Sequence, residues 1–226
     1  EGWDFSQALE YLAQRAGVIL EARTPEREAA DEQNDRLRDL LEQTAAFFSH
    51  HLLHSDAGRP ALEYLHKRGL TDETIQTFGL GYAPASWDAA RQHFMALGFS
   101  QAEMLQAGLL SESPDTGRVY DRFRNRVTFP IRDSRGRMTG FGARILDPND
   151  IPKFLNSPQT PLFDKGSLLY ALDLARKDIR VKDQAVIVEG YLDVIALHQA
   201  GFRNTVSPMG TALSEAQLHL LKRLTR

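Results

Sequence analysis

A glutamate directly follows a short apolar segment near the end of the sequence. Residues 184–188 read QAVIV, an apolar run typical of a buried strand, and Glu189 comes next. Ligands bind at the carboxyl ends of the strands in parallel α/β sheets, so this acid is placed to meet one. Asp193 follows four residues later, which in a helix is the same face one turn on. Two carboxylates so placed could share a hard cation such as Mg²⁺.

Simpler interpretations compete with metal binding. An acid near a helix N-terminus is modestly stabilised by the helix dipole, and spacing alone favours this structural role for Glu189. His50, His51 and His54 have a spacing that could bind zinc, but a polar helix face explains them better. The sequence has no cysteine, which excludes thiolate zinc sites, disulfides and cysteine nucleophiles. It also lacks a Gly-Lys-Ser/Thr phosphate loop and a serine nucleophile elbow.

A basic segment occupies the middle of the chain. Residues 117–154 hold nine basic and four acidic residues, although the whole chain has a net charge of -3. Guanidinium groups bind phosphates and aromatic rings stack on unpaired bases, so the composition suits a single-stranded nucleic-acid track. A solvated strand face is the alternative. The residues concerned are Arg118, Arg122, Arg124, Arg126, Arg132, Arg135, Arg137 and Arg144, with Tyr120, Phe123 and Phe141 among them.

A loop with the sequence KFLNSP at residues 153–158 combines a cation, an aromatic ring and an amide. These groups could hold a nucleotide by its phosphate, its base and a polar edge. Loops of this composition are more often simple turns, so the segment alone is a weak signal.

Helices separated by clear stop signals dominate the first half of the chain. Apolar residues at helical spacing predict one helix before Gly17 and a longer one over residues 27–53. The apolar stripe of the longer helix consists of Leu37, Leu40, Leu41, Thr44, Phe47 and Phe48. Capping residues and glycine stops predict four shorter helices, over residues 61–68, 72–78, 86–97 and 100–107.

The second half predicts strands first and then an α/β order. Alternating residues at 126–132 predict a half-buried strand, and residues 137–146 complete a hairpin. Gly140 and Gly142 leave one face of this hairpin open to a ligand or another strand. A loop over 147–161 and a helix over 167–180 follow. Strands at 184–188 and 204–207, each followed by a helix, predict a parallel pair with a right-handed crossover.

The bulk composition is that of a folded protein outside the membrane. The 226 residues are 42% hydrophobic, enough for one large or two small cores. No apolar run has the length of a membrane span, and the start lacks the features of a signal peptide. We therefore expect a soluble, cytoplasmic protein with no membrane partner.

Taken together, these motifs resemble the catalytic core of bacterial replicative primases. The resemblance covers nearly the whole chain, with the motifs in the same order and at compatible spacing. It rests on YDRFRNRV at 120–127, FPIRD at 129–133, GR at 136–137, GFG at 140–142, KFLNSP at 153–158 and EGYLDV at 189–194, and also on YLHKRGL at 64–70 and GYAP at 81–84.

The resemblance implies a fold and an activity. The fold is α/β, or α+β: a helical and mixed N-terminal subdomain with a basic hairpin at 27–166, then the first β-α-β-α part of a Toprim fold at 167–226. Residues 1–26 form a linker and helix after a zinc-binding domain that this chain lacks. The implied activity is RNA primer synthesis on a single-stranded DNA template from ribonucleoside triphosphates, for replication at the fork, in the nucleoid.

The resemblance also assigns site residues. The first acid of the Toprim motif matches Glu189, which would bind Mg²⁺ or Mn²⁺; Asp193 matches another acid, and Gly210 lies in the following turn. The template-binding ridge maps onto Arg68, Arg122, Arg124 and Arg144, and the nucleotide loop onto Lys153, Phe154, Asn156 and Ser157. Phe154 stands where a tyrosine is often found, so stacking is kept but a hydroxyl is lost.

Several parts of the family pattern are not in this sequence. The Asp-x-Asp pair and a further acid would follow Arg226, so Glu189 and Asp193 should bind magnesium weakly on their own. The domain that binds the replicative helicase would also follow, and no zinc is expected. We therefore expect the chain itself to have weak activity or none. The alternatives are a nucleic-acid-binding module without catalysis and another Toprim enzyme, such as a topoisomerase or a nuclease.

Overall fold

The computed structural model describes residues 5–16, 24–210 and 212–225. The chain divides into two compact units, residues 1–35 and 36–226. Helix α1 (Phe5–Ala16) lies in the first unit, and helix α2 (Pro25–His54) begins there and continues into the second. Both helices were predicted from apolar spacing. Residues 17–23, between the two helices, lie outside the described residues.

The helices of the second unit begin and end largely where the sequence predicts. Thr71 caps α4, its Oγ1 accepting from Thr74 N at 3.2 Å, and Ser100 forms a capping box with Glu103 at the start of α6. Among the described helices, none combines the length and the hydropathy needed to cross a bilayer. The bounds are η1 (Asp56–Gly58), α3 (Arg59–Lys67), α4 (Asp72–Thr77), α5 (Ala89–Ala96) and α6 (Gln101–Gln106).

An antiparallel sheet with the strand order β1-β4-β5-β6 forms the centre of the second unit. The predicted hairpin is confirmed as β4 and β5, with Phe129 opposite Gly142. A separate antiparallel pair, β2 and β3, precedes the hairpin in the sequence. The bounds are β1 (Gly81–Ala83), β2 (Leu110–Glu112), β3 (Val119–Asp121), β4 (Arg126–Arg132), β5 (Met138–Ile145) and β6 (Phe154–Asn156).

The hairpin is buried on both faces, so the prediction of a half-buried strand is wrong. Phe48 of α2 packs against Phe141 with ring centroids 5.5 Å apart. On the opposite face the ring of Tyr191 stacks on Phe129 at 5.1 Å. A Cβ atom on Gly142 would lie 2.5 Å from the Tyr191 ring. The bare glycine backbone is therefore covered by the protein's own side chain, and not open to a ligand.

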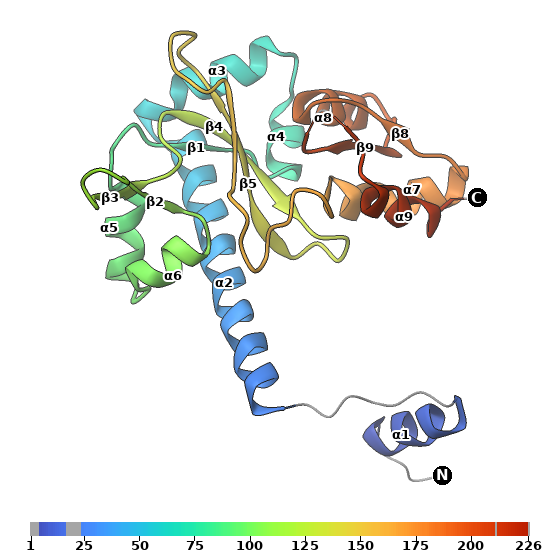
Figure 1. Cartoon of the computed structure of the whole chain (residues 1–226). Coiled ribbons are helices and arrows are strands. Elements are labelled where there is room, and N and C mark those ends of the chain that lie inside the picture. The colour runs from blue at the N-terminus through green and yellow to red at the C-terminus, as the bar shows by residue number, and fades with distance from the viewer. Residues whose placement is uncertain (1–4, 17–23, 211, 226) are drawn as a thin grey trace. The chain divides into compact units, whose positions relative to one another are not determined.

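The elements after Leu168 form a small three-layered part with the sheet order β7-β9-β8. Strands β8 and β9 are parallel, as predicted, with Val186 opposite Thr205. They gather with α7, α8 and α9 on one side of the hairpin, while α5, α6, β2 and β3 lie on the other side (Figure 1). The bounds are β7 (Leu169–Tyr170), α7 (Leu172–Lys182), β8 (Val186–Ile187), α8 (Tyr191–Gln199), β9 (Thr205–Pro208) and α9 (Glu215–Lys222).

Two short strands, β6 and β7, lie where the sequence predicted a loop and the start of a helix. The helix expected over 167–180 starts only at Leu172, because residues 169–170 pair with β9 and Ala171 has a φ of 61°. Strand β6 lies inside the loop expected over 147–161, where it pairs with β5. Both strands have only two or three residues, and each forms by pairing with a longer strand.

One hydrophobic cluster joins the central sheet to the part with the parallel strands. It contains Val127 and Phe129 of β4 together with Tyr191, Val194 and Met209, all buried. A shared core of this kind holds two sheets in a fixed relation. The edge at Glu189 is thereby positioned relative to the basic hairpin.

Buried His198 makes the stability of the fold depend on pH. Its Nε2 donates to Thr205 O at 2.8 Å. Burial lowers the pKa of the imidazole, although this hydrogen bond and the charges of Asp178 and Asp173 act in the opposite direction. The unfolded chain therefore binds more protons near pH 6, so the free energy of unfolding should fall as the pH drops below about 7. Glutamine does not titrate, so in His198→Gln the free energy of unfolding, measured by urea denaturation, should fall less as the pH drops.

The control for this prediction is His219→Gln, at an exposed position on α9. It should leave the pH dependence as in the unsubstituted chain. Burial, together with His50 and His93, also lowers the pKa of His51, so His198→Gln should remove only part of the fall. An unchanged profile in His198→Gln would contradict the prediction.

Candidate metal and nucleic-acid site

Glu189 stands at the carboxyl end of β8, as predicted. The strand is held there by Val188 N donating to Val206 O at 3.0 Å, and by Ser207 Oγ donating to Glu189 O at 2.9 Å. The backbone of Glu189 is thus fixed, while its side chain is exposed. Its carboxylate forms no hydrogen bond or ion pair with another described residue. Both oxygens are accessible to a cation.

Asp193 lies in the first turn of α8, but not by the geometry expected from spacing. Helix α8 begins at Tyr191, so Glu189 precedes the helix and the argument from a shared helical face is wrong. One oxygen of Asp193, Oδ2, accepts from Gly190 N at 3.1 Å and caps the helix. The other oxygen is left for a ligand. Within the described residues, no group of three or more acidic or histidine side chains is arranged to hold a metal.

The turn after β9 brings a lysine to the same edge of the sheet. A Cβ atom on Gly210 would lie 3.1 Å from Cε and 3.4 Å from Nζ of Lys165. Because β8 and β9 are parallel, this turn and Glu189 lie at the same edge. The sequence analysis did not identify Lys165, since nothing in its spacing distinguishes it from other loop lysines.

Arg68 and Asp193 line one pocket of about 260 Å³. It lies where the end of α3 meets the first turn of α8, and Lys67 and Leu192 also line it. The structure therefore brings a predicted template-binding arginine next to a predicted catalytic acid, although 124 residues separate them in the sequence.

Asn156 connects the nucleotide segment to both other parts of the site. Its Oδ1 accepts from the hydroxyl of Tyr191 at 2.8 Å, and its Nδ2 donates to Met209 O at 3.2 Å. Its backbone oxygen accepts from Nε and Nη2 of Arg122, at 3.2 and 2.9 Å. Asn156 thus links the strand edge beside Glu189 to the basic segment.

The other residues of the nucleotide segment divide into exposed and buried ones. Phe154 is 50% exposed, and Lys153 Nζ lies 5.8 Å from the centroid of its ring. Ser157 is buried, and its Oγ accepts from Phe141 N at 2.9 Å. Lys153 and Phe154 are therefore the members of this segment that offer a surface to a ligand.

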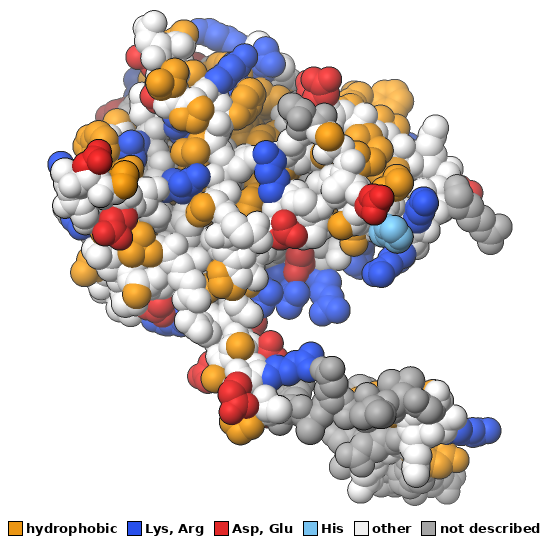
Figure 2. All heavy atoms as spheres, viewed as in Figure 1, with side chains coloured by type: hydrophobic (Ala, Val, Ile, Leu, Met, Phe, Trp, Pro, Cys, Tyr) orange, Lys and Arg blue, Asp and Glu red, His pale blue; other side chains and the backbone are white. Residues whose placement is uncertain are grey.

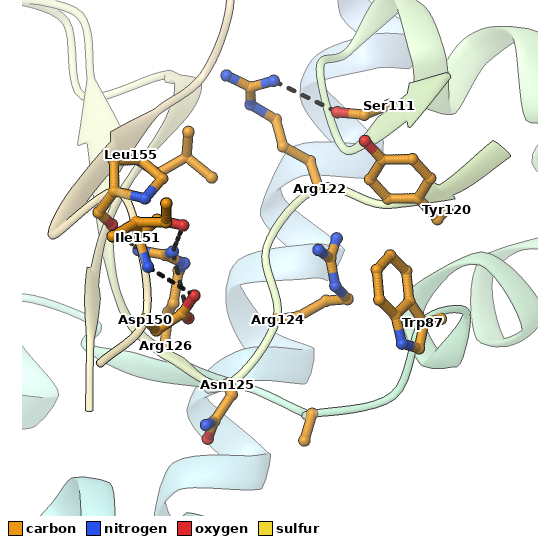
Figure 3. A pocket seen from close by; sticks show the side chains of 12 residues that line it. Trp87, Ser111, Tyr120, Arg122, Arg124, Asn125, Arg126, Asp150, Ile151 and Leu155 are labelled. Atoms are coloured by element: carbon orange, nitrogen blue, oxygen red, sulfur yellow. Dashed lines mark hydrogen bonds and ion pairs between the residues drawn. The ribbon is translucent and has the colours of Figure 1, made fainter. Parts of the chain in front are cut away.

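A pocket of about 460 Å³ lies beside Arg122 and Arg124 (Figure 3). Arg122 Nη1 donates to Ser111 Oγ at 3.3 Å. The Arg124 guanidinium lies over the ring of Trp87, with Cζ 4.0 Å from the centroid, and 4.9 Å from that of Tyr120. Burial lowers the pKa of both arginines, yet a guanidinium keeps its charge at neutral pH.

Trp87 is a candidate binding residue that the sequence analysis missed. It is 52% exposed and lines the pocket, so its ring can meet an unpaired base. Phe123 and Phe141, which the sequence suggested for stacking, are 2% and 0% exposed and belong to the core. The signal for Trp87 was weak, because it is a single aromatic residue in the polar run 86–88.

Several arginines of the basic segment are neutralised inside the protein. Arg126 is 4% exposed, with Nη2 3.4 Å from Asp150, while Arg132 bonds to Glu42 and Arg137 to Asp133. Figure 2 shows Lys and Arg side chains scattered over this face of residues 36–226, not joined in one band. Arg122, Arg124 and Arg144 form no ion pair with a described acid, so they keep their charge for a ligand.

Known proteins resemble the chain along nearly its whole length. The pattern of the DNA primase catalytic core, N-terminal domain, matches residues 47–176, and that of a Toprim domain matches residues 183–226. A DNA primase of Deinococcus radiodurans is 48% identical over 224 residues, which are 99% of this chain and 37% of that protein. The chain thus spans little more than a third of the length of this relative.

Solved structures resemble the fold in the same way. The RNA polymerase domain of the Mycobacterium tuberculosis primase has a TM-score of 0.79 at 39% identity, covering 85% of this chain and 62% of that one. A primase catalytic domain bound to single-stranded DNA has a TM-score of 0.78 at 40% identity, covering 86% and 60%. Sequence pattern, identity and fold agree, and the chain belongs to the DNA primase family, with matches to the N-terminal domain of the catalytic core and to a Toprim domain.

Proposed function

We propose that this chain is the part of a primase that binds single-stranded template and nucleotide and supplies the first acid of the metal site. The parent enzyme would synthesise short RNA primers on DNA from ribonucleoside triphosphates. The observation that carries the proposal is the position of Asn156, which bonds to Arg122 on one side and to Tyr191 and Met209 beside the Glu189 edge on the other. Asn156 would thereby hold the template-binding arginine and the metal-binding strand edge in a fixed relative position.

The template would lie along the pocket that Arg122 and Arg124 line, and would continue towards Arg68 and Arg144. Unneutralised guanidinium groups bind backbone phosphates, and the ring of Trp87 offers a face to one base. The relative with single-stranded DNA bound supports this assignment at the level of the domain.

The incoming nucleotide would meet Lys153 and Phe154. Phe154 is half exposed and can stack on a base, while the Lys153 ammonium can bind a phosphate. Asn156 and Ser157 would act mainly by fixing strand β6, since their side chains are bonded within the protein. Lys165 stands near enough to the strand edge to contact a triphosphate there.

The donor atoms at the strand edge fit a hard divalent cation only in part. Glu189 offers a whole carboxylate and Asp193 one oxygen, and Mg²⁺ or Mn²⁺ prefers such oxygens. The bound ion would neutralise triphosphate charge and promote attack by a ribose 3′-hydroxyl. Glu189 and Asp193 would hold the ion in place. No side chain need act as a nucleophile. Further acids expected after residue 226 would complete the ligand set.

We further propose that the parent enzyme contacts the replicative helicase through a separate C-terminal domain, and that it acts in the cytoplasm, at replication forks of the nucleoid. These assignments rest on the family and not on residues described above.

Primer synthesis by two lengths of the protein tests the proposal. Ribonucleotide incorporation on a single-stranded template would be measured with Mg²⁺ for this chain and for a longer version that includes the expected Asp-x-Asp pair. Both should bind template, but only the longer one should make primers, because Mg²⁺ needs several well-placed oxygens. Full synthesis by the chain of 226 residues would contradict the proposed division of the metal site.

A further inference from the structure

The guanidinium of Arg144 stands over two aromatic rings from different parts of the chain. Its Cζ lies 4.7 Å from the ring centroid of Tyr64 on α3, and 5.9 Å from that of Phe154 on β6. Arg144 and Phe154 are direct partners across the β5–β6 ladder. A helix and two strands therefore converge on one cation.

Apart from these ring contacts, the Arg144 guanidinium has few interactions with described residues. Its one hydrogen bond to a described residue is a long one, from Nη1 to Ile145 O at 3.5 Å, and it forms no ion pair with a described acid. Arg126, by contrast, is closed in by Asp150 and two backbone oxygens. Stacking occupies the face of a guanidinium and leaves the N–H groups at its edge for other partners.

Tyr64 interacts with Arg144 through its aromatic ring and not through its hydroxyl. The Oη atom is buried and has no hydrogen-bond partner among the described residues. An unsatisfied buried hydroxyl costs free energy, so nothing in the fold is gained from it. The ring contact with Arg144 is the interaction that distinguishes Tyr64 from any other half-buried residue of α3.

We propose that Tyr64 is a positioning residue, which holds the Arg144 guanidinium beside Phe154 with its edge N–H groups presented to a template phosphate. Because Phe154 belongs to the nucleotide segment, the stack fixes the template strand relative to the incoming nucleotide. The inference rests on the proposed function in one respect, which is that Arg144 contacts the template.

Single-stranded DNA affinity in a double-mutant cycle tests this role. The variants are Tyr64→Leu, Arg144→Gln and their combination, with Tyr64→Phe as the matched control that keeps the ring. A fluorescently labelled oligonucleotide would be titrated with each at several salt concentrations. Tyr64→Leu should weaken binding about threefold, the effect of losing one exposed cation–π contact. Tyr64→Phe should bind as the unsubstituted chain does.

The cycle separates positioning from general stability. Tyr64→Leu should have no further effect in the Arg144→Gln background, and both single variants should lower the slope of log affinity against log salt by up to about 0.7, one phosphate contact. Tyr64→Met replaces the leucine variant if that does not fold. The inference would be overturned if Tyr64→Leu lowered the DNA affinity equally with and without Arg144→Gln, or if Tyr64→Phe lowered it.

The outcomes also separate this inference from the proposed function. Loss of affinity in Arg144→Gln with none in Tyr64→Leu overturns the positioning role alone. Failure of the unsubstituted chain to bind single-stranded DNA overturns the proposed function, and the inference with it.

Discussion

Glu189→Gln is expected to reduce primer synthesis by the longer version of the chain about a thousandfold, while template affinity stays nearly unchanged. The amide has the same shape as the carboxylate but no charge, so the metal site loses its first ligand. The side chain of Glu189 is exposed and forms no hydrogen bond or ion pair with a described residue, so the fold should not change. Ribonucleotide incorporation and oligonucleotide binding would be measured on the same preparation.

The control for Glu189→Gln is Glu73→Gln, which removes an exposed acid from the first turn of α4. Glu73 lines a pocket with Gln199, which lies at the opposite end of α8 from Glu189, so this variant changes the net charge equally and should leave synthesis unchanged. Retained synthesis in Glu189→Gln would show that the glutamate has only a structural role, which was the simpler interpretation of its position.

Replacing Arg122 and Arg124 together by glutamine is expected to lower the affinity for single-stranded DNA about a hundredfold at low salt. Neither arginine is paired with a described acid, so each can bind a phosphate. Loss of two phosphate contacts should also lower the salt slope by about 1.4. Titration of a labelled oligonucleotide between low and moderate salt measures both quantities.

The matched control removes two exposed arginines elsewhere, Arg135 in the hairpin turn and Arg180 on α7. Arg135→Gln/Arg180→Gln has the same net charge as the Arg122/Arg124 variant. It should bind with nearly the affinity of the unsubstituted chain. An equal loss in the two double variants would mean that total charge, and not the pocket beside Trp87, determines binding.

Local signals predicted much of the fold. Helices α4 and α6 begin directly after Thr71 and Ser100, because the side-chain oxygens of these N-cap residues accept backbone N–H groups three residues later. The β4–β5 hairpin and the parallel pair β8 and β9 also follow from short patterns. The strand end that carries Glu189 could therefore be placed from sequence alone.

Features that depend on tertiary partners could not be predicted. Strands β6 and β7 are too short to show a period, and exist because β5 and β9 offer edges to pair with. The alternation in β4 suggested a solvent face, yet Arg126 and Thr128 are buried because other elements cover that side. Burial of a polar residue depends on its tertiary partners, which a linear pattern does not contain.

The candidate site shows the same limit. Sequence composition pointed to a run of arginines, but acids from α2 and from the loops neutralise several of them. Trp87 and Lys165 enter the site through contacts with residues distant in the sequence, Arg124 and Gly210. Which charges are available to a ligand was decided by packing and not by sequence spacing.

Iron-directed cleavage of the longer chain tests the position of the metal most directly. Fe²⁺ bound in place of Mg²⁺ reduces added hydrogen peroxide to hydroxyl radicals, and added ascorbate regenerates the Fe²⁺. The radicals cut the backbone near the ion, independently of primer synthesis. The cuts should fall around residues 187–193 and 208–210, and should disappear in Glu189→Gln. Cuts that persist in Glu189→Gln, or that fall elsewhere in the chain, would contradict the assignment of Glu189 as a metal ligand.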